Sequence, residues 1–486
     1  MTPYRLASIV TAVALSILSM GSKCGPTPSP TPPGPVPPPP AAFCVVVAAT
    51  DAHAGTAVPG ASVSVGSLIG TTDGNGYLDL RPVLAGPQTL RVQSAGYEPY
   101  EQPIEVESWD CGHDVALTPI ISPLPRVSIR GQQFWADGKP FDWRGVTAFQ
   151  LMQFVATGQP EVARRFMAWM VAHDVNVLRV MTTVRGMFAL PAQDGARVLP
   201  ELLRLAEQER VYLEVVALAD TCPAPDPDGA PCSENDPYFD YRNHVISLGA
   251  SCAASSACLG IEIANEPRHP TQAKNVSASA FLMMLRTLVP PQVLVALGAE
   301  SGADDKSAAY AGADYVTVHL DRADGDHGWR WVRHAREMQV LQDKVNKPIV
   351  NDEPDRKVPF TDQHLALALL TRMYGIGDTV HLASLRYAMV PTGDELAAFE
   401  ARRRGWALVP SGFLGTYSRA TLPGDPVKYV DAAQVLRSYS ALDGDHGFVL
   451  MIGVTRDGAE TAEWNEGWAR ELLAREGGVR FWRVQR

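Results

Sequence analysis

From residue 143 to residue 387 the sequence alternates short apolar stretches with longer amphipathic ones. The apolar stretches have strand length, and they cover 143–149, 176–181, 212–218, 259–264, 293–296, 315–318, 348–351 and 380–387. Helix-like stretches lie between them, at 161–173, 199–209, 277–288, 329–345 and 362–374. Regular alternation of strand and helix predicts an α/β fold, in which parallel strands are joined by crossover helices.

Eight such units in about 270 residues are typical of a (β/α)8 TIM barrel. An open, doubly wound sheet is the competing fold, but no Gly-x-Gly-x-x-Gly follows the first strand-like stretch. We therefore expect residues 126–405 to form a TIM barrel, with a small β-sandwich before it and a β-rich accessory region at 406–486. Within that last region, 463–476 is either strand or helix.

The N-terminal segments are not typical of a folded domain. An apolar run from Leu6 to Met20 is too short to cross a bilayer comfortably, and it indicates an export signal within residues 1–24. Residues 25–42 are almost entirely Pro, Thr, Ser and Gly, which predicts an extended linker. Cys24 is a lipidation candidate that would tether the protein to a membrane, and cleavage after Gly21 is the alternative. We expect an exported protein, either a cell-surface or outer-membrane lipoprotein or a periplasmic or extracellular protein.

The chain has seven cysteines, which fits an oxidising compartment. With Cys24 set aside for lipid, the other six form three close pairs along the sequence. These disulfide candidates are Cys44 with Cys111, Cys222 with Cys232, and Cys252 with Cys258. Six cysteines allow 15 pairings, and the local one is favoured because each pair lies within one domain or loop. No Cys-x-x-Cys or Cys/His cluster indicates a metal site, so we expect no metal and no cofactor.

Residues 43–120 combine short β-branched runs with turn signals, which predicts the small β-sandwich. The motifs that stand out are Val58-Pro59-Gly60-Ala61, Thr71-Thr72-Asp73 with Gly76, Leu90-x-Val92 and Gly96-Tyr97. This series resembles the carboxypeptidase regulatory-like, transthyretin-type modules. The resemblance implies a module that stabilises or positions its neighbour and carries no catalytic residue.

In a TIM barrel the catalytic side chains lie at the C-terminal ends of the strands. Carboxylates follow the fourth and seventh strand-like stretches, as Asn265-Glu266-Pro267 and as Glu353-Pro354. Over residues 126–405 the sequence resembles the clan A glycoside hydrolases, which include cellulases and mannanases. The resemblance implies a retaining enzyme that cleaves β-linked glycosides or polysaccharides by double displacement, with Glu266 as acid/base and Glu353 as nucleophile. In retaining enzymes the two carboxyl groups lie about 5–5.5 Å apart.

Further polar residues at strand ends are candidates for substrate binding or for support of the glutamates. The resemblance implies that Arg179 orients the nucleophile, Asn265 binds a sugar 2-hydroxyl and His319 matches a histidine found in several of these families. The other substrate-binding candidates are Asp321, Trp329 and His381, and Asp352 is expected to support its neighbour.

The sequence departs from the family pattern at two positions. Many members have a tyrosine where this chain has Asp321, and a tryptophan in the eighth strand, where it offers His381, Ser384 and Arg386. Asp321, Arg322 and His381 would form a polar subsite, which suggests the hypothesis of a charged or heavily hydroxylated sugar.

The formal net charge of −11 argues against nucleic acid as a partner, so an oligo- or polysaccharide is the expected one. A non-catalytic carbohydrate-binding or surface scaffold protein, with a decayed barrel site, is the main alternative. A metal-dependent hydrolase that uses His319, Asp321 and Glu353 is a second. The peptidase and serine hydrolase alternatives are weaker, since no Gly-x-Ser-x-Gly is present.

Overall fold

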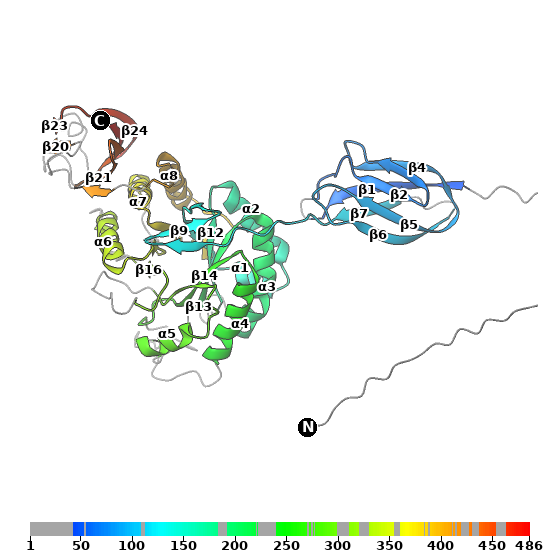
Figure 1. Cartoon of the computed structure of the whole chain (residues 1–486), viewed down its shortest axis with the longest axis horizontal. Coiled ribbons are helices and arrows are strands. Elements are labelled where there is room, and N and C mark those ends of the chain that lie inside the picture. The colour runs from blue at the N-terminus through cyan, green and yellow to red at the C-terminus, as the bar shows by residue number, and fades with distance from the viewer. Residues whose placement is uncertain are drawn as a thin grey trace, which may run out of the picture. The chain divides into compact units, whose positions relative to one another are not determined.

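A computed structural model describes most of the chain in two compact units, residues 1–120 and 121–486 (Figure 1). The described residues are 42–52, 55–107, 112–182, 192–219, 221, 240–269, 272–273, 276, 278–298, 311–319, 330–353, 360–382, 384–386, 389–410, 412–413, 416–418, 427–429, 437–452 and 463–486.

The first unit is a β-sandwich. Its strands are β1 (Ala42–Asp51), β2 (Ser62–Val65), β3 (Leu68–Thr71), β4 (Tyr77–Leu84), β5 (Gly86–Gln93), β6 (Tyr100–Val106) and β7 (Gly112–Leu117). They form one sheet in the order β4-β1-β7 and another in the order β3-β2-β5-β6. Alternate residues of both sheets, such as Val47 on β1 and Val92 on β5, are fully buried in one shared core. The expected sandwich is therefore present.

The second unit contains eight parallel strands in one sheet. They are β11 (Arg144–Thr147), β12 (Val177–Met181), β13 (Tyr212–Leu218), β14 (Cys258–Ala264), β15 (Leu294–Ala296), β16 (Val316–Val318), β17 (Ile349–Asn351) and β18 (Gly377–Val380). Consecutive strands are neighbours, and the first pairs with the last, in the order β15-β14-β13-β12-β11-β18-β17-β16. At the remaining seam, the amide of Asp314, just before β16, donates to the carbonyl of Val295 at 2.7 Å. The sheet thus forms a nearly closed barrel, and the predicted TIM barrel is confirmed.

Helices flank the strands of this barrel (Figure 1). They are α1 (Leu151–Ala156), α2 (Pro160–Ala172), α3 (Ala192–Glu209), α4 (Tyr241–Ala254), α5 (Ser279–Arg286), α6 (Arg330–Val345), α7 (Thr361–Met373) and α8 (Asp394–Leu408), with a 3-10 turn at Ser384–Arg386. A hairpin precedes the barrel, formed by β8 (Ser128–Arg130), β9 (Gln133–Ala136) and β10 (Lys139–Pro140). None of the helices in the described part of the chain is both long and apolar enough to span a bilayer.

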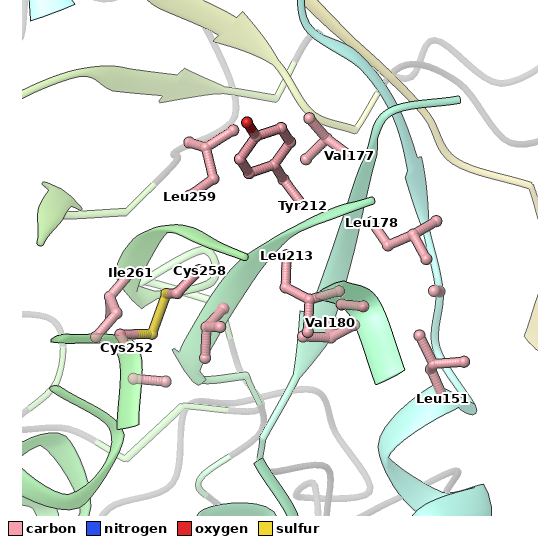
Figure 2. Close-up of a cluster of buried hydrophobic side chains, with 14 of the residues drawn as sticks. Leu151, Val177, Leu178, Val180, Tyr212, Leu213, Cys252, Cys258, Leu259 and Ile261 are labelled. Carbon is pink, nitrogen blue, oxygen red and sulfur yellow. A yellow bond between two sulfur atoms is a disulfide. The ribbon is translucent and has the colours of Figure 1, made fainter. Parts of the chain in front are cut away.

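Apolar side chains from strands and helices form the barrel's main core (Figure 2). Val177, Leu213 and Ile261 come from three neighbouring strands and are fully buried. A disulfide joins Cys252, near the end of α4, to Cys258, the first residue of β14, as the sequence predicts. Cys44 is also disulfide-bonded, and its expected partner Cys111 lies outside the described residues.

The C-terminal region is a second β structure. Its strands are β19 (Thr416–Ser418), β20 (Val427–Tyr429), β21 (Arg437–Asp443), β22 (His446–Ile452), β23 (Glu463–Trp464), β24 (Ala469–Glu476) and β25 (Val479–Gln485). Five of them form an antiparallel sheet in the order β19-β21-β22-β25-β24, and β20 pairs with β23. Residues 463–476 therefore contain two strands, β23 and β24, rather than a helix. Phe448 and Phe481 of this sheet are buried in one cluster with Leu365 and Leu369 of α7. Packing between the barrel and this sheet explains why α7 is buried on almost every face from Gln363 to Met373.

One strand was placed wrongly from the sequence. The eighth strand covers Gly377–Val380 rather than 380–387, and part of the expected segment is the 3-10 turn. Gly377 and Asp378 are residue types that strands usually avoid. Here β18 pairs with β11 in parallel, with Asp378 opposite Arg144, and this tertiary pairing outweighs local preference.

Candidate active site

Arg179 is the cation around which the site is built. It lies in the middle of β12, a strand in which every residue is buried, and its own side chain is fully buried. Its Nη1 donates to Glu353 Oε1 at 2.9 Å, and its Nη2 donates to Glu262 Oε2 and to Asn265 Oδ1, both at 2.7 Å. Its Nε donates to Glu262 Oε2 at 3.0 Å and lies 3.2 Å from Asp352 Oδ2 as an ion pair. The planar guanidinium therefore binds side chains from β14 and β17 at the same time, which a single ammonium group cannot do.

The two candidate catalytic glutamates face each other across the end of the barrel. Glu266 follows β14 and Glu353 follows β17, and a carboxylate oxygen of one lies within 4.8 Å of a carboxylate oxygen of the other. The side chain of Glu266 is 17% exposed, whereas that of Glu353 is only 3% exposed. Ends of distant parallel strands thus bring together two carboxyl groups, one of which has more access to solvent.

Glu266 also has an unusual backbone. Its φ angle is +40°, in the left-handed region that residues with a Cβ atom rarely adopt. Such strain persists only where the surrounding structure holds it, and it is concentrated at functional sites. The backbone thus holds this glutamate where the fourth strand ends.

His319 follows β16 and stands between the carboxylates. Its Nδ1 is 2.8 Å from Glu266 Oε1 and 3.8 Å from Glu353 Oε2, and its Nε2 is 3.2 Å from Asp352 Oδ1. Burial is the largest influence on the pKa of His319 and would lower it. The charge of Asp352, together with the contact to Glu266, outweighs burial and raises that pKa above its ordinary value. The ring is therefore held toward its protonated form.

His381 follows β18 and lies close to Glu353. Its Nε2 is 3.8 Å from Glu353 Oε2, its Nδ1 is 3.1 Å from Thr147 Oγ1, and its ring packs edge-on against Phe149. The side chain is buried. Of the other substrate-binding candidates, Asp321 and Trp329 lie outside the described residues, as do Cys24, Cys222 and Cys232.

Two buried acidic residues of the barrel strands were not predicted from the sequence. Glu214 on β13 and Glu262 on β14 are fully buried. The hydroxyl of Tyr315 donates to Glu214 Oε1 at 2.9 Å, and Glu262 accepts from Arg179. Each of these glutamates is the only carboxylate in an apolar run, within Tyr212–Leu218 and Cys258–Ala264, and this pattern could have identified both residues from the sequence. A charge in a strand that is buried on both faces needs a partner, and for Glu262 that partner is Arg179.

Burial and mutual repulsion set the charge states of this cluster. Burial raises the pKa of Glu214 well above its usual range, and the nearby charges of Glu262 and Asp352 raise it further. Burial also raises the pKa of Glu262, although Arg179 opposes the shift. For Arg179, burial favours the neutral form, but the surrounding carboxylates raise its pKa and keep it a cation. Arg179 therefore stays positively charged, whereas Glu214 favours its protonated, neutral form.

Two groups of side chains have spacings that could hold a metal ion. Within the described residues these are Glu262, His319 and Asp352, and Glu266, His319 and Glu353, with ligand atoms within 4.8 Å of one another in each group. However, Arg179 already contacts Glu262, Asp352 and Glu353. A fixed guanidinium opposes the negative charge that would attract a divalent cation, so the arrangement fits paired carboxyl chemistry better.

Comparisons with known proteins give similarities of fold only. No protein-family model and no curated protein sequence matches the chain. Among solved structures, a β-1,4-D-mannanase from Cryptopygus antarcticus is 12% identical, over 58% of this chain and 95% of that chain, with a TM-score of 0.41. A β-glucanase from Saccharophagus degradans, in complex with cellotetraose, is 12% identical over 58% and 94%, with a TM-score of 0.43. An endo-β-1,4-mannanase from Thermotoga petrophila is 14% identical over 72% and 92%, with a TM-score of 0.41.

Proposed function

We propose that this chain is a retaining glycoside hydrolase that cleaves β-linked glycosides or polysaccharides, with Glu266 as acid/base and Glu353 as nucleophile. The observation that carries the proposal is that one carboxylate oxygen of Glu266 and one of Glu353 lie within 4.8 Å of each other at the end of the barrel, which requires the two carboxyl groups to be neighbours. Retaining enzymes need a separation of about 5–5.5 Å, whereas inverting enzymes need roughly 6.5–9.5 Å to leave room for a water molecule.

In the first step Glu353 attacks the anomeric carbon while Glu266 gives its proton to the departing glycosidic oxygen. The bond to the leaving sugar breaks, and a glycosyl ester of Glu353 forms. Attack requires an ionised carboxylate, and Arg179 at 2.9 Å favours that state for Glu353. The positive charge of Arg179 therefore prepares the nucleophile before substrate arrives.

In the second step Glu266, now a carboxylate, takes a proton from water, and the resulting hydroxide attacks the anomeric carbon. The ester bond to Glu353 breaks and the sugar leaves with its original configuration. Asn265 Oδ1 is bound to Arg179, which leaves its amide N–H groups to donate to a sugar hydroxyl next to the reacting carbon. His319 supports the ionised form of Glu266 from its buried side.

Azide rescue tests the two roles separately. With 4-nitrophenyl β-glycosides as substrates, Glu353→Ala in azide is expected to release an α-glycosyl azide, because azide attacks in place of the missing nucleophile. Glu266→Ala in azide is expected to release a β-glycosyl azide, because azide replaces water in the second step. The matched control is Glu161→Ala, on the exposed surface of α2, which should behave like the wild type.

Other outcomes would replace this proposal. An inverted anomer as the first product of the wild-type enzyme would mean that the same residues act by single displacement. Binding of oligosaccharides without turnover of any glycoside, including activated aryl glycosides, would favour the carbohydrate-binding alternative.

We also propose that the chain is exported, with lipid on Cys24 as the tether and the first unit as a regulatory-like module that positions the barrel. The two-sheet core of residues 42–117 is compatible with such a module. Mass spectrometry of the mature N-terminus tests the tether. A diacylglyceryl group on Cys24 supports it, and an unmodified N-terminus at Ser22 contradicts it.

A further inference from the structure

We propose that Asp352 is a positioning residue that couples the two candidate catalytic glutamates, by holding His319 with one carboxylate oxygen and Arg179 with the other. This inference rests on the proposed function, and it adds a role for a buried residue that does not touch the substrate.

Asp352 bridges His319 and Arg179, one with each carboxylate oxygen. Asp352 Oδ1 lies 3.2 Å from His319 Nε2, and Asp352 Oδ2 lies 3.2 Å from Arg179 Nε. Each of these two cationic groups also contacts a candidate catalytic glutamate, since His319 Nδ1 is 2.8 Å from Glu266 and Arg179 Nη1 is 2.9 Å from Glu353. One chain of contacts from the acid/base to the nucleophile therefore runs through Asp352, beside the longer approach of His319 Nδ1 to Glu353 Oε2 at 3.8 Å.

Burial makes this bridge strong. The side chains of Asp352 and Arg179 are fully buried, and that of His319 is 1% exposed. Charges interact more strongly away from water than on a surface. The backbone of Asp352 is held as well, because its amide donates to the carbonyl of Val318, the residue just before His319. The aspartate and the histidine are thus joined through both backbone and side chain.

The consequence for His319 is a preferred protonation state. A negative charge beside Nε2 favours a proton there and favours the doubly protonated ring, which agrees with the raised pKa of His319. A protonated ring can donate from Nδ1 to Glu266. Such a bond stabilises Glu266 when it is a carboxylate, the form that it takes after it has protonated the leaving oxygen and before it takes a proton from water.

Other charged groups also face His319. In the described part of the chain, Glu262 and Glu266 approach from the β14 side and Glu353 from the β17 side, and Arg179 lies beyond Asp352. Glu266 already has its own contact to Nδ1, and Arg179 neutralises much of the charge of Glu262. Asp352 is therefore the carboxylate that controls the Nε2 side of the ring.

A measurement without substrate tests the bridge directly. Nitrogen-15 NMR of histidine-labelled full-length protein follows the titration of His319, which is assigned from the signal lost in His319→Gln. In the wild type His319 should titrate above the ordinary histidine range. In Asp352→Asn it should titrate at lower pH, because the amide has the same shape and no charge. A wild-type His319 that titrates at or below the ordinary range would overturn the proposal, even if Asp352→Asn did not fold.

The pH profile of kcat/KM gives the functional readout. For Asp352→Asn we expect a loss of roughly 10- to 100-fold at neutral pH, as for a lost contact to a charged group. We also expect the alkaline limb to move, because Glu266 must keep its proton to act as the acid and the contact with His319 Nδ1 couples the titrations of the two groups. A fall in activity with an unchanged profile would mean that Asp352 is only structural, and it would overturn the inference.

Asp378→Asn is the matched control. Asp378 is also buried and also pairs with an arginine, Arg402 at 3.3 Å, but it lies near the other end of the barrel strand, away from the glutamates. Its substitution should change stability without moving the pH profile. Failure of the proposed function would appear separately, as activity that survives in Glu353→Ala, whereas the NMR titration tests the bridge with no catalysis at all.

Discussion

Arg179 Nη1 and Glu353 Oε1 form an ion pair of 2.9 Å in which neither side chain is more than 3% exposed to solvent. The arginine comes from the second barrel strand and the glutamate follows the seventh. A buried pair of this kind costs desolvation energy, which its other contacts offset only while every partner is present. The pair therefore ties the charge of the candidate nucleophile to the stability of the barrel.

Arg179→Lys should impair both activity and folding. The lysine keeps the charge but cannot bind Glu353, Glu262 and Asn265 together, so kcat/KM should fall by roughly 10- to 100-fold for each charged contact that is lost. The free energy of unfolding should fall by about 3–5 kcal/mol if a buried carboxylate is left without its partner. Kinetics and chemical denaturation measure the two effects. Arg204→Lys on the exposed surface of α3, where Arg204 pairs with Glu201, is the control, and an equal loss there would contradict this account.

Glu266→Gln should show a strong dependence on the leaving group. Without the acid, natural sugar leaving groups depart slowly, whereas nitrophenolates need no proton. The loss of kcat/KM should therefore be larger by a factor of at least about 100 for an unactivated glycoside than for a 4-nitrophenyl glycoside. Glu353→Gln should lose both activities alike. Equal losses for the two substrates in Glu266→Gln would exclude Glu266 as the acid.

Glu214→Gln should flatten the dependence of stability on pH. The pKa of Glu214 is raised by burial, so the folded state binds a proton at pH values where the unfolded state has released it. Its contribution to stability is thus complete below the ordinary pKa of glutamate and is lost as pH rises through the folded value. Gln cannot ionise and keeps an acceptor for Tyr315. Urea denaturation across a pH series should show a smaller decline toward high pH in the variant, and an unchanged slope would contradict the assignment.

Chelation should leave activity unchanged. Arg179 already contacts Glu353, Glu262 and Asp352, so the cluster contains its own cation. Dialysis against EDTA followed by an assay with and without added Zn²⁺ or Mn²⁺ checks this expectation. Loss of activity that a metal restores would instead favour the metal-dependent hydrolase alternative.

The architecture could be predicted from residues 143–387 because strand and helix periodicities differ in the sequence. Seven of the eight strands lie within two or three residues of their expected positions at either end. The eighth strand was predicted too far along the chain, because Gly377 and Asp378 have no local preference for strand structure. They form a strand only because β18 pairs with β11. The candidate glutamates could also be found, since Asn265-Glu266-Pro267 and Glu353-Pro354 directly follow apolar strands.

The contacts among the buried charged residues next to the candidate glutamates could not be predicted from a local sequence pattern. The contact of Arg179 with the candidate nucleophile was expected only through the family resemblance, because every residue of β12 is buried and its sequence alone does not indicate which side chains face the interior of the barrel. The contacts of Arg179 with Glu262 and Asp352, and those of Asp352 with His319, join residues that are distant in the chain. Local sequence sets which segments become strands. The closure of the barrel, with its register and strand order, sets which buried charges meet, because a charge away from water is stable only where the fold supplies its partner.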